Sequence, residues 1–162
     1  MYSLLIHFYA FIIALISPFH RKARLMRFGQ WKTNSILREK IDRNAKYIWF
    51  HASSLGEFEQ GRPIIESIKA AMPEKKILVT FFSPSGYEVR KNYSNADLIC
   101  YLPFDLPGNV RRFLDIVKPS QAIFIKYEFW ANYLNELASR RIPTYIVSAI
   151  FRSKQIFFRP YG

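Results

Sequence analysis

One glutamate, Glu57, stands where an apolar run gives way to a helical pattern in the stretch WFHASSLGE, residues 49–57. The spacing from Ser54 to Glu57 fits a capping box, in which the serine and the glutamate satisfy unpaired N–H groups at a helix start. A carboxylate at the end of a strand also has the position that a general base needs, and Ser53 and Gly56 are small enough to let a ligand approach. The helix dipole is expected to keep this carboxylate ionised. Spacing alone favours the cap, and both roles stay open at this point.

A second loop, SPSG, runs from Ser83 to Gly86 after another apolar run. Ser83 as N-cap and Pro84 at the first helical position are typical of a helix start. The exposed N–H groups of such a start can also bind phosphate, so Ser83, Ser85 and Gly86 are candidate substrate-binding residues. Helix-start chemistry and ligand binding both remain open for this loop.

Glu128 stands close to Lys126 in IFIKYEFWAN, directly after a third apolar run. The two residues fit either a helix-start acid with its counter-charge or a substrate-binding site at a strand end. His51 fits a ligand, an acid or a hydrogen-bonding residue at the end of its strand. No second His or Cys lies at metal-ligand spacing, so we predict no metal site. The sequence has neither the dinucleotide-binding glycine motif nor the P-loop motif, and we predict no cofactor.

These loops follow short apolar runs that alternate with amphipathic stretches from Lys46 onward. The pattern indicates a parallel sheet covered by helices on both faces, which is a Rossmann-like α/β fold. Ligands of such folds bind beyond the carboxyl ends of the strands, where all of these loops are expected to meet. The predicted strands are 47–50, 76–82, 98–102, 122–126 and 144–148, and the predicted helices are 57–72, 85–93, 108–117 and 128–139.

Residues 1–19 contain no Asp, Glu, Lys or Arg and are apolar almost throughout. About 20 apolar residues span a bilayer, so we predict a transmembrane anchor here, and the basic residues that follow place the rest of the chain in the cytoplasm. A buried or interfacial helix is the alternative. Residues 20–45 are expected to form a basic juxtamembrane segment with a short helix at 31–43. Four of its side chains are candidates for contact with the membrane or with phosphate groups: Arg21, Lys22, Arg24 and Lys32.

The chain of 162 residues has 24 basic and 12 acidic side chains, a net charge of +12. Such a charge indicates an anionic partner, which could be nucleic acid, lipid headgroups or a phosphorylated substrate. The charge clusters beside the apolar segment and no nucleic-acid-binding motif accompanies it, so we expect anionic lipid and no nucleic acid. The single cysteine, Cys100, cannot form an intrachain disulfide and is expected in the core.

The order of the strand-end motifs resembles the N-terminal domain of the 3-deoxy-D-manno-octulosonic acid (Kdo) transferases. WFHASSLGE resembles the family's H-A-x-S-x-G-E stretch, and YLPFDLPGNVRRFLDIVKP is similar to its Y-x-P-x-D segment with the helix that follows. KYEFWANYL looks like E-x-E-x-W-P-N, with Lys126 in place of the first acid and Ala131 in place of the proline. FFSPSG corresponds loosely to T-x-T-x-x-G. Members of the family add Kdo to the lipid A precursor at the cytoplasmic face of the Gram-negative inner membrane, in lipopolysaccharide biosynthesis.

The resemblance implies the N-terminal half of a GT-B glycosyltransferase, with an incomplete acceptor domain over residues 46–162 and without the domain that holds the donor, CMP-Kdo. It implies an inverting transfer with Glu57 as the catalytic base. It also implies that Ser54, Gly56 and Glu128 bind the acceptor or maintain the geometry of the site. On this basis we expect the chain alone to be inactive or only partly active. A non-catalytic, membrane-anchored module that binds anionic lipid is the alternative.

Overall fold

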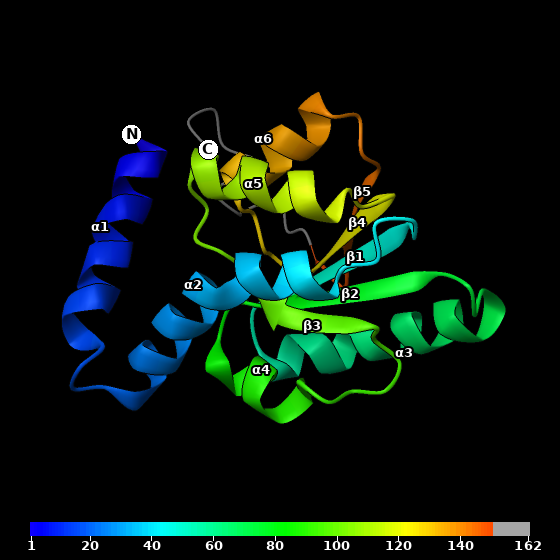
Figure 1. Cartoon of the computed structure of the whole chain (residues 1–162), viewed down its shortest axis with the longest axis horizontal. Coiled ribbons are helices and arrows are strands. Elements are labelled where there is room, and N and C mark those ends of the chain that lie inside the picture. Colours follow the sequence, from blue (N-terminus) through cyan, green and yellow to red (C-terminus); the bar gives the residue numbers. More distant parts are fainter. Residues whose placement is uncertain (151–162) are drawn as a thin grey trace.

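The computed structural model describes residues 1–150, and five parallel strands form one sheet at its centre (Figure 1). The order across the sheet is β3-β2-β1-β4-β5, so the direction of winding reverses between β1 and β4, as in doubly wound α/β folds. The strands are β1 (Tyr47–Ala52), β2 (Lys76–Phe81), β3 (Leu98–Tyr101), β4 (Gln121–Ile125) and β5 (Thr144–Val147). The predicted Rossmann-like fold is confirmed for the described residues, and the last twelve residues of the expected domain, 151–162, lie outside them.

Helices cover both faces of this sheet, with α5 and α6 on one side and α3 and α4 on the other in Figure 1. Each face buries its own apolar cluster: Trp49 packs with Phe113 and Tyr133, whereas Phe50 packs with Phe58 and Ile65. Neighbouring residues of β1 enter different clusters because successive side chains of a strand point to opposite faces. The helices are α1 (Tyr2–Ile16), α2 (Arg21–Lys40), α3 (Leu55–Ala71), α4 (Pro84–Arg90), α5 (Pro107–Val117) and α6 (Ala131–Ser139).

Local sequence sets the ends of several helices. Pro84 and Pro107 stand in the first turns of α4 and α5, where a fixed φ is favourable and a missing N–H costs nothing. Lys118 ends α5 in the left-handed conformation, with φ of 45°. Cys100 is buried in the core, as expected.

The N-terminal segment differs from its prediction. Within residues 1–150, no helix is both long enough and apolar enough to cross a membrane, so the predicted transmembrane helix over residues 1–19 is not found. Helix α1 has 15 residues, which at about 1.5 Å per residue is shorter than the roughly 30 Å of a bilayer core. The chain turns after Ile16, at Ser17 and Pro18.

Contacts with distant loops hold α1 against the α/β domain. The Tyr2 hydroxyl donates to Asp105 Oδ2 at 2.7 Å, and the ring of Tyr9 contacts the rings of Phe82 and Phe104. Other apolar side chains of α1 remain exposed, among them Leu4 and Phe8. Helix α1 is therefore apolar on its outer side and bonded to the domain on its inner side.

Helix α2 is longer than the short helix expected at 31–43, because it begins at Arg21. It packs on the edge strand β3, where Thr33 Oγ1 donates to the carbonyl oxygen of Tyr101 at 2.8 Å. The ring of Tyr101 lies where a Cβ at position 29 would stand, so only Gly29 allows α2 to approach the sheet this closely. The basic segment is thus an integral helix of the domain.

Candidate active site

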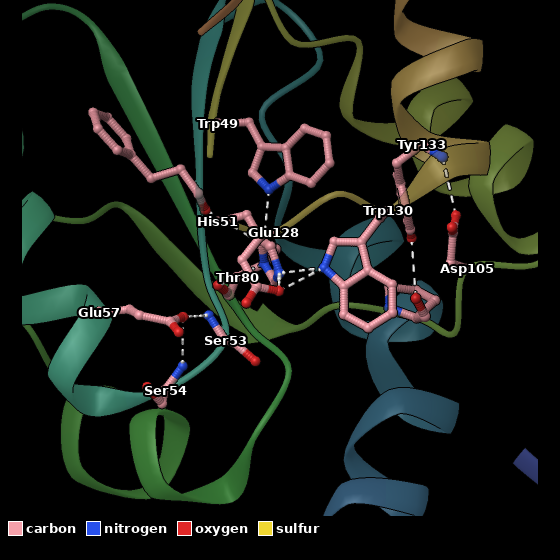
Figure 2. A network of polar contacts seen from close by, with 12 residues as sticks. Trp49, His51, Ser53, Ser54, Glu57, Thr80, Asp105, Glu128, Trp130 and Tyr133 are labelled. Carbon is pink, nitrogen blue, oxygen red and sulfur yellow. Dashed lines mark hydrogen bonds and ion pairs between the residues drawn. The ribbon is translucent and has the colours of Figure 1, made fainter. Parts of the chain in front are cut away.

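The carboxyl ends of β1 and β4 are neighbours in the sheet and flank the point where the winding direction reverses. Open α/β sheets bind their ligands in the crevice outside such a point. The loop after β1 carries Glu57, and the loop after β4 carries Glu128. Figure 2 shows both carboxylates at this rim of the sheet, together with the polar residues that surround them.

Glu57 is held by backbone N–H groups. Its Oε2 atom accepts from the N–H of Ser53 at 2.6 Å and from the N–H of Ser54 at 3.3 Å, which is the glutamate half of the predicted capping box. Its Oε1 atom accepts no hydrogen bond from the described residues. Glu57 thus caps α3 with one oxygen, and the second oxygen is available to a substrate.

Burial raises the pKa of Glu57 above its ordinary value, and the nearby negative charge of Glu128 raises it further. The N–H groups of Ser53 and Ser54 and the imidazole of His51 act in the opposite direction without cancelling the rise. The net effect is a raised pKa of Glu57, with burial as the largest cause. A raised pKa makes the ionised form of Glu57 a stronger base.

Glu128 is held by side chains. The indole Nε1–H of Trp130 donates both to Glu128 Oε2, at 2.8 Å, and to His51 Nε2, at 3.1 Å. Glu128 Oε2 lies 3.5 Å from His51 Nε2, so the indole proton lies between two acceptors that face each other. The Trp130 N–H thereby links the β4 loop to the end of β1.

A buried chain of hydrogen bonds fixes the imidazole of His51. Its Nδ1 atom lies 2.9 Å from Thr80 Oγ1 and 3.1 Å from the Thr80 carbonyl oxygen. Because the indole of Trp130 can only donate, His51 Nε2 is an acceptor and the ring proton is on Nδ1. Thr80 Oγ1 also accepts from the indole of Trp49 at 2.8 Å, which ties this chain to the core. Of the roles open to His51, the structure supports a hydrogen-bonding residue at a strand end.

Asp105 is a fully buried carboxylate next to this rim. It accepts from the N–H groups of Asn132 and Tyr133 at the start of α6, at 3.1 Å and 3.0 Å, and from the Tyr2 hydroxyl. Burial raises its pKa, and these three donors act to lower it. Asp105 therefore caps α6 from a distant loop and joins α6 to α1.

The remaining predicted site residues lie at different distances from the rim. Gly56 is exposed, and a Cβ there would meet no other atom within 4 Å, so its surface is open to a ligand. Gly86 is buried beneath the ring of Phe81, where its lack of a side chain serves packing. Lys126 has a left-handed backbone, with φ of 66°, and turns the chain after β4 toward Glu128.

Ser83 and Ser85 form one end of α4. Ser83 Oγ accepts from the N–H of Ser85 at 3.3 Å, which confirms the predicted N-cap, and the backbone N–H of Ser83 donates to the Ser53 carbonyl oxygen at 2.8 Å. The β1 and β2 loops are thereby joined beside Glu57. The basic candidates Arg21, Lys22, Arg24 and Lys32 are all exposed on α2.

The roles of three residues of this region were not predicted from the sequence. Trp130 and Asp105 stand in the quoted segments that resemble family motifs, but their hydrogen bonds were not foreseen. An indole near a loop carries a polar N–H that needs a partner, and Asp105 is a lone acid between an apolar run and a proline. Thr80 lies inside a strand and had no signal, because its partners come from other strands.

Comparisons with known proteins show the family of this chain. The family model described as 3-Deoxy-D-manno-octulosonic-acid transferase (kdotransferase) matches residues 22–159. A 3-deoxy-D-manno-octulosonic acid transferase of Haemophilus influenzae is 30% identical over 139 residues, 85% of this chain and 31% of the relative. The transferase of Aquifex aeolicus is 34% identical over 110 residues, 67% of this chain and 30% of the relative.

A plant protein is also similar. The probable mitochondrial 3-deoxy-D-manno-octulosonic acid transferase of Arabidopsis thaliana is 28% identical over 144 residues, 88% of this chain and 32% of the relative. The chain thus spans about a third of the length of these curated relatives. The family match covers both rim loops, with Glu57 and Glu128. The chain belongs to the family of 3-deoxy-D-manno-octulosonic acid transferases.

Proposed function

We propose that this chain forms the acceptor-side domain of a GT-B enzyme that transfers Kdo from CMP-Kdo to the lipid A precursor (lipid IVA) in lipopolysaccharide core biosynthesis. Family membership supports the transferred sugar. One observation of the site supports the chemistry: Glu57 stands at the switch point of the sheet, with a raised pKa and one carboxylate oxygen that accepts no hydrogen bond within residues 1–150. Perturbed carboxylates in such a position are typical of catalytic acids and bases.

The proposed reaction is a single displacement. A hydroxyl of the acceptor sugar gives its proton to the carboxylate of Glu57 while its oxygen attacks C2 of Kdo. The bond between C2 and the phosphate oxygen of CMP breaks, and CMP leaves as an anion that needs little protonation. One base therefore suffices, and attack opposite the leaving group inverts the configuration at C2.

The neighbours of Glu57 are proposed to place the acceptor. Gly56 leaves an open surface beside the carboxylate, and Ser54 stands at the start of the same helix. Glu128 lies near Glu57 on the other loop and is proposed to accept from an acceptor hydroxyl, with Lys126 at the turn before it. The donor, CMP-Kdo, is proposed to bind chiefly to the larger part of the enzyme that this chain does not span.

The exposed basic residues of α2 are proposed to contact acceptor phosphates and anionic headgroups at the cytoplasmic face of the inner membrane. The four positions are Arg21, Lys22, Arg24 and Lys32. Reversing their charges together should weaken binding of the chain to vesicles that contain the lipid A precursor, and wild-type binding should fall steeply with salt. Reversal of four exposed basic residues outside α2 is the matched control: Arg43, Lys46, Lys118 and Arg141. Equal loss in both quadruple variants would show that only net charge matters.

The experiment that tests the function is a chimera. Residues 22–159 replace the matching segment of the Haemophilus influenzae relative, which supplies the remaining two thirds of the protein. The purified chimera should transfer Kdo from CMP-Kdo to lipid IVA. A folded chimera that binds lipid IVA without transferring Kdo would contradict the proposal and favour a non-catalytic binding module.

A further inference from the structure

One side of helix α1 contacts the loops that surround the candidate active site. Tyr2 and Tyr9 are seven residues apart, which is about two helical turns, so both side chains lie on the same side of α1. The Tyr2 hydroxyl donates to Asp105 Oδ2 at 2.7 Å, and the ring of Tyr9 contacts the rings of Phe82 and Phe104. These three partners follow the carboxyl ends of β2 and β3. The inner side of α1 is therefore part of the rim of the sheet.

Asp105 joins α1 to the start of α6. The N-cap residue of α6 is Trp130, whose indole can donate a hydrogen bond but cannot accept one from the N–H groups of the helix. Asp105 supplies the cap instead, because its two carboxylate oxygens accept from the N–H groups of Asn132 and Tyr133 (Figure 2). The Asn132 amide also donates to the Asp105 carbonyl oxygen at 2.6 Å and to Ser3 Oγ at 3.3 Å. The first turn of α6 is thus bonded to Asp105 and to α1.

Trp130 links the start of α6 to Glu128. Its Nε1–H donates to Glu128 Oε2 at 2.8 Å, and its ring packs on the ring of Phe82 with the two centroids 4.6 Å apart. Phe82 also contacts the ring of Tyr9 on α1. Two continuous paths therefore run from α1 to Glu128. One passes through Asp105 and the first turn of α6, and the other passes through the ring of Phe82.

The hydrogen bond from Tyr2 matters because Asp105 is fully buried. Burial raises the pKa of Asp105, and the Tyr2 hydroxyl acts to lower it. A buried carboxylate that loses a donor is destabilised, so it is expected either to move toward water or to take up a proton. In both cases the cap that Asp105 forms on α6 becomes weaker.

We infer that Tyr2 is a positioning residue for the transfer reaction, because it holds Glu128 at the rim through Asp105 and the first turn of α6. The inner side of α1 then has a use that is separate from its exposed, apolar outer side. The positioning of Glu128 is inferred from the contacts alone, whereas its effect on the transfer rate rests on the proposed function.

NMR of the whole chain in detergent solution tests the positioning without any transfer reaction. The Nε1–H signal of Trp130 reports on its hydrogen bonds and should move in Tyr2→Phe, which removes only the hydroxyl group. Tyr9→Leu should move it as well, because the ring contact with Phe82 is lost. Phe8→Leu is the matched control, since Phe8 is 63% exposed on the same helix, and it should leave the signal in place. A Trp130 signal that is the same in Tyr2→Phe as in the wild type would overturn the inference.

The effect on transfer is measured in a chimera that carries residues 1–159 of this chain, so that α1 is included. With lipid IVA supplied in detergent, attachment to a bilayer does not limit the rate. Tyr2→Phe should lower kcat by about fivefold, and Phe8→Leu should lower it by less than about twofold. Equal rates for Tyr2→Phe and the unchanged chimera would overturn the role of Tyr2 in the reaction. A chimera that transfers no Kdo before any substitution would contradict the proposed function, and the NMR result would then decide the positioning of Glu128.

A double variant separates positioning from a general loss of stability. If Tyr2 acts through Trp130, adding Tyr2→Phe to the Trp130→Phe chimera should slow transfer by less than about twofold, because Glu128 has already lost the indole that holds it. A further loss of about fivefold would show that the two residues act independently, and would overturn the inference. Thermal unfolding of each variant checks that the same fraction of protein is folded in all of the assays.

Discussion

Glu57 and Glu128 lie at the same rim of the sheet, but different parts of the chain hold them (Figure 2). The loop from β1 to α3 is short, and main-chain N–H groups bind Glu57. The loop from β4 to α6 is longer, begins with a left-handed Lys126, and depends on the indole of Trp130 to hold Glu128. The position of Glu57 therefore survives most side-chain changes around it, whereas the position of Glu128 depends on one side chain. The carboxylate of Glu57 is therefore fixed in place, whereas the carboxylate of Glu128 can move when its single side-chain partner changes.

The largest effect is expected from Glu57→Gln in the chimera. Glutamine still accepts the N–H of Ser53 and cannot take a proton, so the transfer rate should fall by roughly 10² to 10⁴ while the unfolding temperature stays nearly constant. Glu57→Ala is the matched variant, because it removes both functions and should also cost about 1 kcal/mol of stability. Near-normal transfer by the glutamine variant would leave Glu57 only its capping role.

Trp130→Phe should have the next largest effect, because it keeps an aromatic ring and removes the N–H that Glu128 and His51 share. Two acceptors then face each other without a donor, which costs about 1–3 kcal/mol, and the transfer rate should fall by about tenfold as Glu128 moves. Crystallography or NMR of the variant checks the displacement. Phe129→Leu, next in the same loop, is the control. A Glu128 that keeps its place in Trp130→Phe would show that the β4 loop is as rigid as the β1 loop.

Ser54→Ala tests the opposite loop. The variant removes the serine of the capping box and leaves the backbone N–H groups that hold Glu57, so stability should fall by about 1 kcal/mol. Transfer should fall by less than about threefold, since the carboxylate keeps both donors. Thermal unfolding and initial rates check the two values. A loss of activity as large as that of Glu57→Gln would mean that the serine, and not the main chain, positions the base.

The smallest effect is a displacement of the pH profile by Glu128→Gln. The negative charge of Glu128 contributes to the raised pKa of Glu57, so its removal should lower that pKa. Transfer requires the ionised base and rises with pH through its pKa, so the acidic limb of the profile should move to lower pH. The plateau rate at higher pH should fall by less than the roughly tenfold expected of Trp130→Phe, because the glutamine oxygen can still accept from a hydroxyl of the acceptor. A limb that stays in place or moves to higher pH would show that the two carboxylates are not coupled.

The sequence predicted the sheet and the position of Glu57 because both depend on local patterns. Apolar runs, prolines and the S-x-x-E spacing involve residues that are near one another in the chain. The partners of Trp130 and Asp105 could not be found in this way, since Trp130 bonds to a residue 79 positions away and Asp105 to one 103 positions away. The prediction for the N-terminal segment failed for the same reason, because its partners are also distant in the sequence. Its composition indicates a membrane helix, but Tyr2 and Tyr9 have polar and aromatic partners that only the fold supplies.

The two bonds that fasten the start of α1 have a consequence for the order in which the protein forms. Tyr2 is bonded to Asp105, and Ser3 Oγ accepts from Asn132, which the ribosome adds much later. During synthesis, α1 leaves the ribosome long before its docking site exists, and chains fold as they emerge. During that interval, the apolar residues of α1 have no folded surface of their own chain on which to pack. Whatever covers it then, whether a chaperone or a bilayer surface, must release it once residue 132 has emerged.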